Sequence, residues 1–155
     1  MAKSIEDRLQ KRIIKTRLLY HFDELNKVNI HRYIDYKYGL AGVIKLANGQ
    51  FLGVFSEGPF YPKLDSKYDA IILSLSNRRV FSPLPKHQTI TYDEQAVIFG
   101  NNDIRLKTCE KKMFSNFGNS NSAYDCEGEK VDVLLGDNHS REAAINGYEF
   151  YEVIF

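Results

Sequence analysis

The stretch Ala41–Phe55, AGVIKLANGQFLGVF, decides how the rest of the chain is interpreted. Two apolar runs rich in Val, Ile, Leu and Phe flank Asn48-Gly49, a dipeptide that readily adopts the positive φ angles of a tight type I′ hairpin turn. An isolated hairpin is only marginally stable in water, so its apolar face must pack against more sheet or against a helix. The sequence therefore predicts a β-hairpin inside a larger, strand-rich fold.

The composition is that of a globular protein with a single domain. The chain has 155 residues, 43% hydrophobic and 26% charged, and its ten Phe and ten Tyr residues favour strands. The net charge of +1 argues against a globally basic surface for nucleic acid. No segment approaches the roughly 18 consecutive apolar residues of a membrane span, and the start lacks the apolar core of a secretory signal. We expect an intracellular protein, cytoplasmic or nuclear.

Apolar runs separated by turn residues predict strands along the chain, at 18–22, 69–75, 78–82, 89–92, 95–99, 103–107, 131–135 and 148–155. The last of these is apolar on both faces, which indicates a central strand. A helix is expected over 30–38, capped by Asn29, and a further turn of helix at 140–144. Residues 110–128 are dominated by Lys, Ser, Asn and Gly and predict a long surface loop.

Residues 1–15 predict a basic amphipathic helix ahead of a single domain that comprises residues 16–155. Ser4 is expected to cap its first turn, with Asp7 in capping-box register. Apolar side chains recur at four-residue spacing on one face: Ile5, Leu9 and Ile13. Basic side chains occupy the other faces: Lys3, Arg8, Lys11, Arg12, Lys15 and Arg17. Either the helix packs its apolar stripe on the domain, or the segment is a basic arm for anionic lipid, nucleic acid or an acidic partner.

The sequence offers little for redox or metal chemistry. Cys109 and Cys126 are the only cysteines, and in a reducing compartment we expect free thiols, with a disulfide or redox switch as the alternative. Lysines close to Cys109 favour a lowered pKa there, so Cys109 is the redox candidate. Asp125 and Glu127 flank Cys126 and are expected to raise its pKa by repulsion. The four His residues lie far apart, and neither a metal site nor a cofactor is predicted.

Catalytic motifs are absent from the sequence, including GxSxG, HExxH and the P-loop. A hydrolase could in principle recruit Ser122 or Ser140 with His139, and with Asp137 or Glu152 as the acid. A triad is defined by geometry, however, and not by the presence of these residue types. We therefore expect a protein that is not an enzyme.

Four stretches carry a family resemblance: RLLYHF, with a short helix and GLAGVIKLANGQFLGVFSEGPF after it; YDAIILSLSNRRVFSP; AVIFGNNDIRL; and NSNSAYDCEG, followed at a distance by NGYEFYEVIF. In this order they resemble the TLDc domain, the module of the oxidation-resistance proteins, over residues 16–155. The positions that match family motifs are Gly53, Phe99, Gly100, Asp103 and Glu152. The chain departs from the family at 56–59, where the usual aromatic run is missing, and at 93–94, where many members are rich in Gly and Asn. Both departures fall in surface loops and so bear more on a shared partner than on the fold.

The resemblance implies an α+β fold in which two antiparallel β-sheets pack as a sandwich with short flanking helices. It also implies a non-catalytic protein–protein interaction domain linked to the oxidative stress response, and in several members to binding of the vacuolar proton-ATPase. Recognition by such a domain is expected in its polar loops. The candidate partner-binding residues are Lys111, Lys112, Asn119, Asn121, Asp137, His139 and Arg141.

The alternative function is a stress-responsive regulator that binds nucleic acid through a local basic patch. The basic N-terminal segment could contact phosphates together with Arg105, Lys107, Lys111 and Lys112, provided that these side chains share one face. No motif that reads nucleic-acid sequence accompanies them, so we place this function second.

Overall fold

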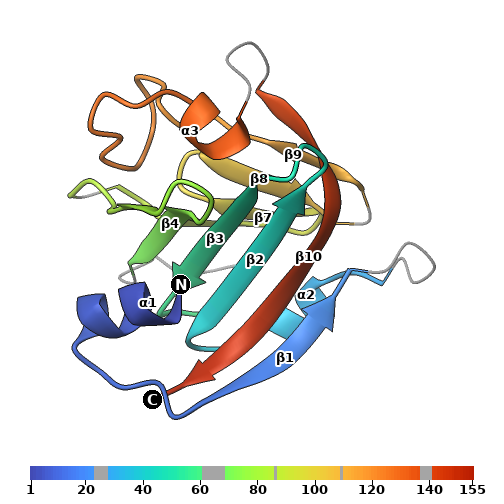
Figure 1. The fold of residues 1–155 in the computed structure, drawn as a ribbon. Coiled ribbons are helices and arrows are strands. Elements are labelled where there is room, and N and C mark those ends of the chain that lie inside the picture. The colour runs from blue at the N-terminus through green and yellow to red at the C-terminus, as the bar shows by residue number, and fades with distance from the viewer. Residues whose placement is uncertain (23–27, 61–68, 86, 109, 137–140) are drawn as a thin grey trace.

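The fold consists mainly of antiparallel strands (Figure 1). The computed structural model describes residues 1–22, 28–60, 69–85, 87–108, 110–136 and 141–155. Its helices are α1 (Ala2–Leu9), α2 (His31–Ile34) and α3 (Asp132–Leu135). Its strands are β1 (Lys15–His21), β2 (Leu40–Leu46), β3 (Phe51–Ser56), β4 (Ala70–Ser74), β5 (Arg79–Phe81), β6 (Ile90–Asp93), β7 (Ala96–Phe99), β8 (Ile104–Lys107), β9 (Lys112–Phe114) and β10 (Glu142–Ile154).

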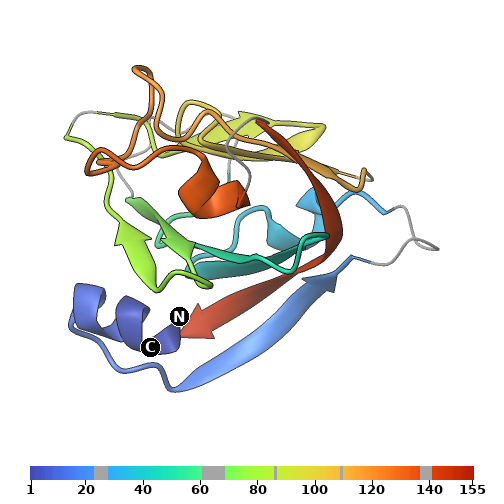
Figure 2. The same ribbon diagram turned by 45° about the horizontal axis from the view of Figure 1, so that its top comes forward.

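Two antiparallel sheets face each other and share β10. The first sheet has the strand order β5-β4-β3-β2-β10, with β1 on the other side of β10, and the second has the order β10-β9-β8-β7-β6. Residues 142–144 of β10 pair with β9, whereas the rest of the strand pairs with β2 and β1. Figure 2 shows the sheets as two layers joined by the long, curved β10. The chain is thus an α+β sandwich, which is the fold that the sequence resemblance implies.

The predicted hairpin is present as β2 and β3, but its turn is not type I′. Gly49 has a φ of 88°, whereas Asn48 has no positive φ. The N–H of Gly49 donates to the C=O of Leu46, and the N–H of Leu46 donates to the C=O of Gln50. These bonds define a three-residue loop closed by a glycine bulge. The side chain of Asn48 has a different role. Its Nδ2 donates a hydrogen bond to the C=O of Leu135, 2.6 Å away, and so connects the turn to α3.

The main core lies between the two sheets. Leu52 and Val54 of β3 point into it, and Tyr148 and Phe150 of β10 pack beside them. Phe99 of β7, in the opposite sheet, belongs to the same core cluster. Alternate residues of each strand face this core, which is the two-residue periodicity from which the strands are predicted.

A bulge in β10 changes which of its residues face the core. The pairing of β10 with β2 shifts between Ile145 and Gly147. Ile145 faces the main core before the bulge, and Phe150 faces it afterwards, so the buried positions change from odd to even numbers. Val153 therefore packs on the opposite face of the sheet from Phe150. The bulge thus explains why the last strand is apolar on both faces.

Helix α1 covers part of the outer face of the first sheet. Ile5 is 1% exposed and belongs to a second, smaller cluster with Ala41, Phe55, Ile71, Leu73 and Val153. The guanidinium of Arg8 donates to Ser82 Oγ at 2.9 Å and lies 3.5 Å from the carboxylate of Asp69. Of the two interpretations of this segment, the helix that packs its apolar stripe on the domain is confirmed.

The helix is shorter than the predicted 1–15. It begins at Ala2, no side chain caps it, and the expected cap residue Ser4 lies inside it. Gln10 follows in the left-handed conformation with a φ of 53°, which ends the helix. The chain then enters β1 at Lys15.

Helix α2 is also shorter than predicted, and its N-cap is Ile30 and not Asn29, although Asn29 still bonds to its first turn. The N–H of His31 donates to Asn29 Oδ1 at 3.0 Å, and the helix ends at Ile34 because Asp35 is extended. His31 is buried, with Nδ1 2.6 Å from Asp35 Oδ1 and Nε2 3.1 Å from the C=O of Ala96. It is therefore a hydrogen-bonded histidine that joins α2 to the second sheet.

Two segments near the C-terminus differ from the prediction. The expected strand at 131–135 is helix α3, and its apolar residues Val131, Leu134 and Leu135 are buried together at helical spacing. Residues 142–144, where a turn of helix is expected, are strand β10 and pair with β9. Strand β9 lies inside the expected loop, and of its three residues only Met113 is buried. Among the described residues, none of the helices is long and apolar enough to cross a membrane.

Replacing Ile5 tests whether α1 contributes to stability. Ile5→Ala removes a fully buried side chain, so we expect the free energy of unfolding to fall by about 2–4 kcal/mol. Ile14→Ala is the matched control, since Ile14 is 76% exposed and its loss should change stability by less than about 0.5 kcal/mol. Urea denaturation of both variants measures the difference. Equal losses would contradict the docking of α1.

Candidate functional site

A buried carboxylate organises the corner between β7 and β8. Asp103 is 0% exposed, and its Oδ2 accepts hydrogen bonds from the N–H of Asn101 at 3.1 Å and of Ala123 at 2.9 Å. Its Oδ1 accepts a short hydrogen bond from the hydroxyl of Ser122. Ser122 and Ala123 belong to the loop of residues 115–124, so one carboxylate attaches this loop to the turn between two strands.

Burial raises the pKa of the Asp103 carboxyl above its ordinary value. The hydrogen bonds from Ser122, Ala123 and Asn101 act in the opposite direction, because they favour the ionised form. The main chain of Asp103 takes part as well, since Ser115 Oγ donates to its C=O at 2.5 Å. The corner is thus a dense set of polar contacts inside an apolar core.

Gly100 makes room for this arrangement. Its φ is +64°, a conformation that side chains rarely adopt, and a Cβ there would lie 2.2 Å from Asp103 Oδ2. The same Cβ would lie 2.8 Å from the ring of Tyr124. Glycine is therefore required here both by the backbone and by the packing.

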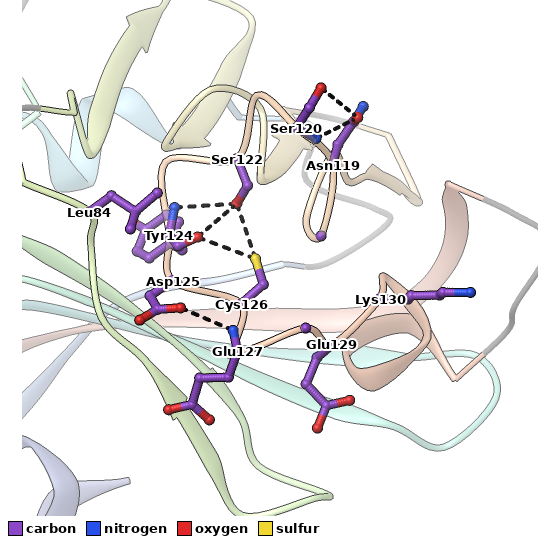
Figure 3. Close-up of a pocket in the computed structure, with 12 residues that line it drawn as sticks. Leu84, Asn119, Ser120, Ser122, Tyr124, Asp125, Cys126, Glu127, Glu129 and Lys130 are labelled. Atoms are coloured by element: carbon purple, nitrogen blue, oxygen red, sulfur yellow. Dashed lines mark hydrogen bonds between the residues drawn. The ribbon is translucent and has the colours of Figure 1, made fainter.

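A pocket of about 460 Å³ opens beside the loop (Figure 3). Leu84 and most of residues 118–130 line it. Figure 3 shows Ser122 and Cys126 next to each other, and their Oγ and Sγ atoms are 3.3 Å apart. A continuous series of polar contacts thus runs from buried Asp103 through Ser122 to the half-buried thiol of Cys126.

This series does not activate the thiol. Burial raises the pKa of Cys126, hydrogen bonds with Ser122 and the backbone of Gly118 oppose it, and the negative charges of Asp103 and Asp125 add a smaller increase. A thiol with a raised pKa stays protonated at neutral pH and is a weak nucleophile. The raised pKa of Cys126 agrees with the prediction from the sequence, but burial contributes more to it than the charges of neighbouring carboxylates do.

The residues considered for catalysis are not brought together among the described parts of the chain. The hydroxyl of Ser122 is bound to Asp103. Glu152 lies on β10 and pairs with Arg17 of β1 at 2.5 Å. Asp137, His139 and Ser140 lie outside the described residues, as does the redox candidate Cys109.

The candidate partner-binding residues divide into two places. Asn119 and Asn121 are exposed in the loop beside the pocket. Arg141 lies at the base of this loop, where its Nη1 donates to the C=O of Ser115 at 3.2 Å. Exposed Lys111 and Lys112 lie farther along, at β9. Asp137 and His139, also candidates for partner binding, cannot be placed because they lie outside the described residues.

Acidic neighbours compensate part of the basic patch proposed for nucleic acid. Arg105 pairs with Asp93 at 2.8 Å, and Lys107 with Glu110 at 3.2 Å. In the N-terminal segment, Lys3 pairs with Asp7 at 2.7 Å. These pairs reduce the positive charge that a phosphate backbone would meet.

Three of the family-motif positions meet in the corner. Phe99 is buried and packs edge-to-face on Phe60, while Gly100 and Asp103 form the polar part described above. The other two, Gly53 and Glu152, lie in the first sheet. The role of Ser115 is not predicted from the sequence, and Ser122 is predicted there only as a candidate nucleophile. A serine that anchors a loop carries no motif, so the fold alone identifies it.

No family model matches this sequence, and a search of curated proteins finds no relative. Within the part of the chain that the structure describes, no group of three or more His, Cys, Asp or Glu side chains is arranged to hold a metal ion.

Two substitutions of Asp103 separate its hydrogen bonds from its charge. Asp103→Ala leaves the hydroxyl of Ser122 and two buried N–H groups without an acceptor, so we expect a loss of about 3 kcal/mol of unfolding free energy. Asp103→Asn keeps the volume and an acceptor oxygen, and should cost about 1 kcal/mol. Chemical denaturation gives both values, and equal losses would exclude the anchoring role.

The raised pKa of Asp103 also predicts a pH dependence. The contribution of the Asp103 carboxyl to the free energy of unfolding is fully present below the ordinary aspartate pKa of about 3.9. It is lost as the pH rises through the pKa of Asp103 in the folded chain. The stability of the native protein relative to Asp103→Asn should therefore fall as the pH is raised above about 4. A constant difference would show that the pKa of Asp103 is the same in the folded and unfolded chain.

Gly100→Ala tests the close packing at the corner, with Gly49→Ala as its control. Both positions have positive φ, but a Cβ at Gly49 meets no atom within 4 Å. We expect Gly49→Ala to cost about 1–2 kcal/mol for the backbone conformation. Gly100→Ala should cost about 2 kcal/mol more, because the loop must move away from Asp103. Thermal unfolding measures both, and similar losses would contradict the packing argument.

Proposed function

We propose that this chain is a non-catalytic interaction domain of the TLDc type that acts in the oxidative stress response by binding a protein partner. The vacuolar proton-ATPase is the first partner to test, because the sequence resemblance implies it for several members of that family. The proposed place of action is the cytoplasm, with the nucleus as the alternative.

The observation that carries the proposal is the anchoring of an exposed loop by a buried carboxylate. Asp103 binds Ser122 and Ala123 at one end of the loop, and Ser115 Oγ donates to its C=O at the other end. Asn119 and Asn121 between them are exposed. A polar loop held in one conformation loses little entropy on binding and is suited to recognition.

The chemistry of the pocket supports an interaction role over catalysis. The Ser122 hydroxyl is committed to Asp103, and the raised pKa of Cys126 keeps its thiol protonated. Three family-motif residues, Phe99, Gly100 and Asp103, serve the packing of this corner. Their roles are structural, as in a domain whose function is to present a surface.

Binding of nucleic acid stays the second function. Arg105 and Lys107, which would form the centre of the patch, are paired with Asp93 and Glu110. An interface for phosphates would have to break or share these pairs. The protein-binding proposal requires no such rearrangement.

A binding experiment with purified vacuolar proton-ATPase tests the proposal. We expect the wild-type protein to bind, and Asn121→Arg to bind at least tenfold more weakly, because a bulky charge then stands on the presented loop. The internal hydrogen bond at this position uses the C=O of Asn121, so the fold should persist. Biolayer interferometry on the immobilised domain measures both affinities.

Glu94→Arg is the matched control, since it introduces the same side chain at an exposed turn of the second sheet. It should bind within twofold of wild type. No binding by the wild type would reject this partner. Binding to single-stranded nucleic acid that weakens steeply with added salt would favour the second function instead.

A further inference from the structure

Strand β1 forms an open edge of the first sheet. It hydrogen-bonds to β10 on one side, and within the described residues no strand pairs with its other side. It has seven residues, whereas β5 at the opposite edge has three. Figure 1 shows β1 as the outermost strand beside β10. A long unpaired edge can accept an additional strand.

The pairing shows which backbone groups of β1 face outward. The N–H of Val153 donates to the C=O of Gly39, so the backbone of Val153 points toward β2. By the alternation of an antiparallel pair, the backbone of Tyr151 points the same way. Their partners in β1 are Thr16 and Leu18, whose N–H and C=O groups must therefore point to the open edge.

Two exposed apolar side chains lie along this edge. Ile14 is 76% exposed and Leu18 is 52% exposed. Leu18 lies opposite Tyr151 and so shares the outer face of the sheet with it. An added strand with apolar residues on that face would cover Leu18.

The other face of the edge is basic. Arg17 lies opposite Glu152 and pairs with it, yet is about half exposed, and Lys15 beside it is exposed. Residues 10–22 hold four basic residues, Lys11, Arg12, Lys15 and Arg17, and no acidic one. Lysine and arginine on an edge oppose the approach of a like-charged strand and favour an acidic one.

We propose that the open edge of β1 binds an extended acidic peptide of a protein partner, which adds to the first sheet as a further strand. Its backbone pairs with Thr16 and Leu18, its apolar residues lie over Leu18, and its carboxylates face Lys15 and Arg17. This gives the basic N-terminal segment a function that the docking of α1 leaves unassigned. The edge is separate from the loop anchored by Asp103, so its test does not depend on the proposed function.

The charge pattern argues against a second copy of the chain at this edge. Two β1 strands pairing with each other would bring Lys15 and Arg17 of both copies together, which is unfavourable for like charges. An acidic peptide replaces this repulsion by attraction. Its binding should therefore weaken as the ionic strength rises.

The test uses a nine-residue peptide that alternates valine and glutamate, with blocked ends, and amide hydrogen exchange of the whole protein. We expect saturating peptide to slow exchange at Thr16 and Leu18 at least tenfold. The amides of Lys15 and Arg17, which face β10, should change less than twofold. A peptide with lysine in place of glutamate should cause no protection.

Thr16→Pro removes one outward N–H without removing a bond to β10, and should weaken peptide binding at least tenfold. Thr16→Val is the matched control, because it keeps the N–H and should bind within twofold of wild type. A peptide N-methylated at alternate residues tests the same hydrogen bonds on the unmodified protein, and should bind at least tenfold more weakly.

Three results would overturn the proposal: no protection of Thr16 and Leu18 by the glutamate peptide, equal binding of the lysine or N-methylated peptide, or protection that appears without peptide as the protein concentration rises. The last result would show that a second copy occupies the edge.

Discussion

The sandwich depends on the backbone of β10, which pairs with three other strands. Its first residues belong to the second sheet with β9, and the remainder lies between β2 and β1 in the first sheet. The bulge between Ile145 and Gly147 lies where the strand passes from one sheet to the other. A bulge adds one residue and bends the strand. It therefore allows β10 to pass from one layer to the other, with side chains in the common core both before and after the bend.

The corner around Asp103 shows how a polar group can be placed inside such a core. Removing a carboxylate from water is unfavourable, and this is why its pKa rises. Donors from Asn101, Ser122 and Ala123 offset part of this cost. In return the loop is attached to the sandwich through side-chain and backbone bonds, and a polar, exposed surface is held in one position.

The outer face of the first sheet is divided between a covered and an open part. Helix α1 buries Ile5 against it, and the chain then returns along the edge as β1. The docking of α1 uses the apolar stripe of the basic segment together with Arg8, which donates to Ser82, whereas Lys11, Arg12 and Lys15 remain exposed. One short segment therefore both closes a second core and leaves a basic strand edge that no strand of the described residues pairs with. The packed helix uses the apolar side chains of this segment, whereas a basic arm for an acidic partner would use its exposed basic side chains. The two interpretations of the segment are therefore compatible.

The sequence by itself determined the strands with strong two-residue alternation, the hairpin of β2 and β3, and the central place of the last strand, because local periodicity reports burial directly. It also determined that residues 1–15 carry one apolar stripe. Only the tertiary structure decided that 132–135 is a helix, since a five-residue segment with four apolar residues fits either period. Likewise only the fold brings Asp103 to Ser122, nineteen positions later in the chain. A contact of that kind depends on how sheets stack, and no local pattern encodes it.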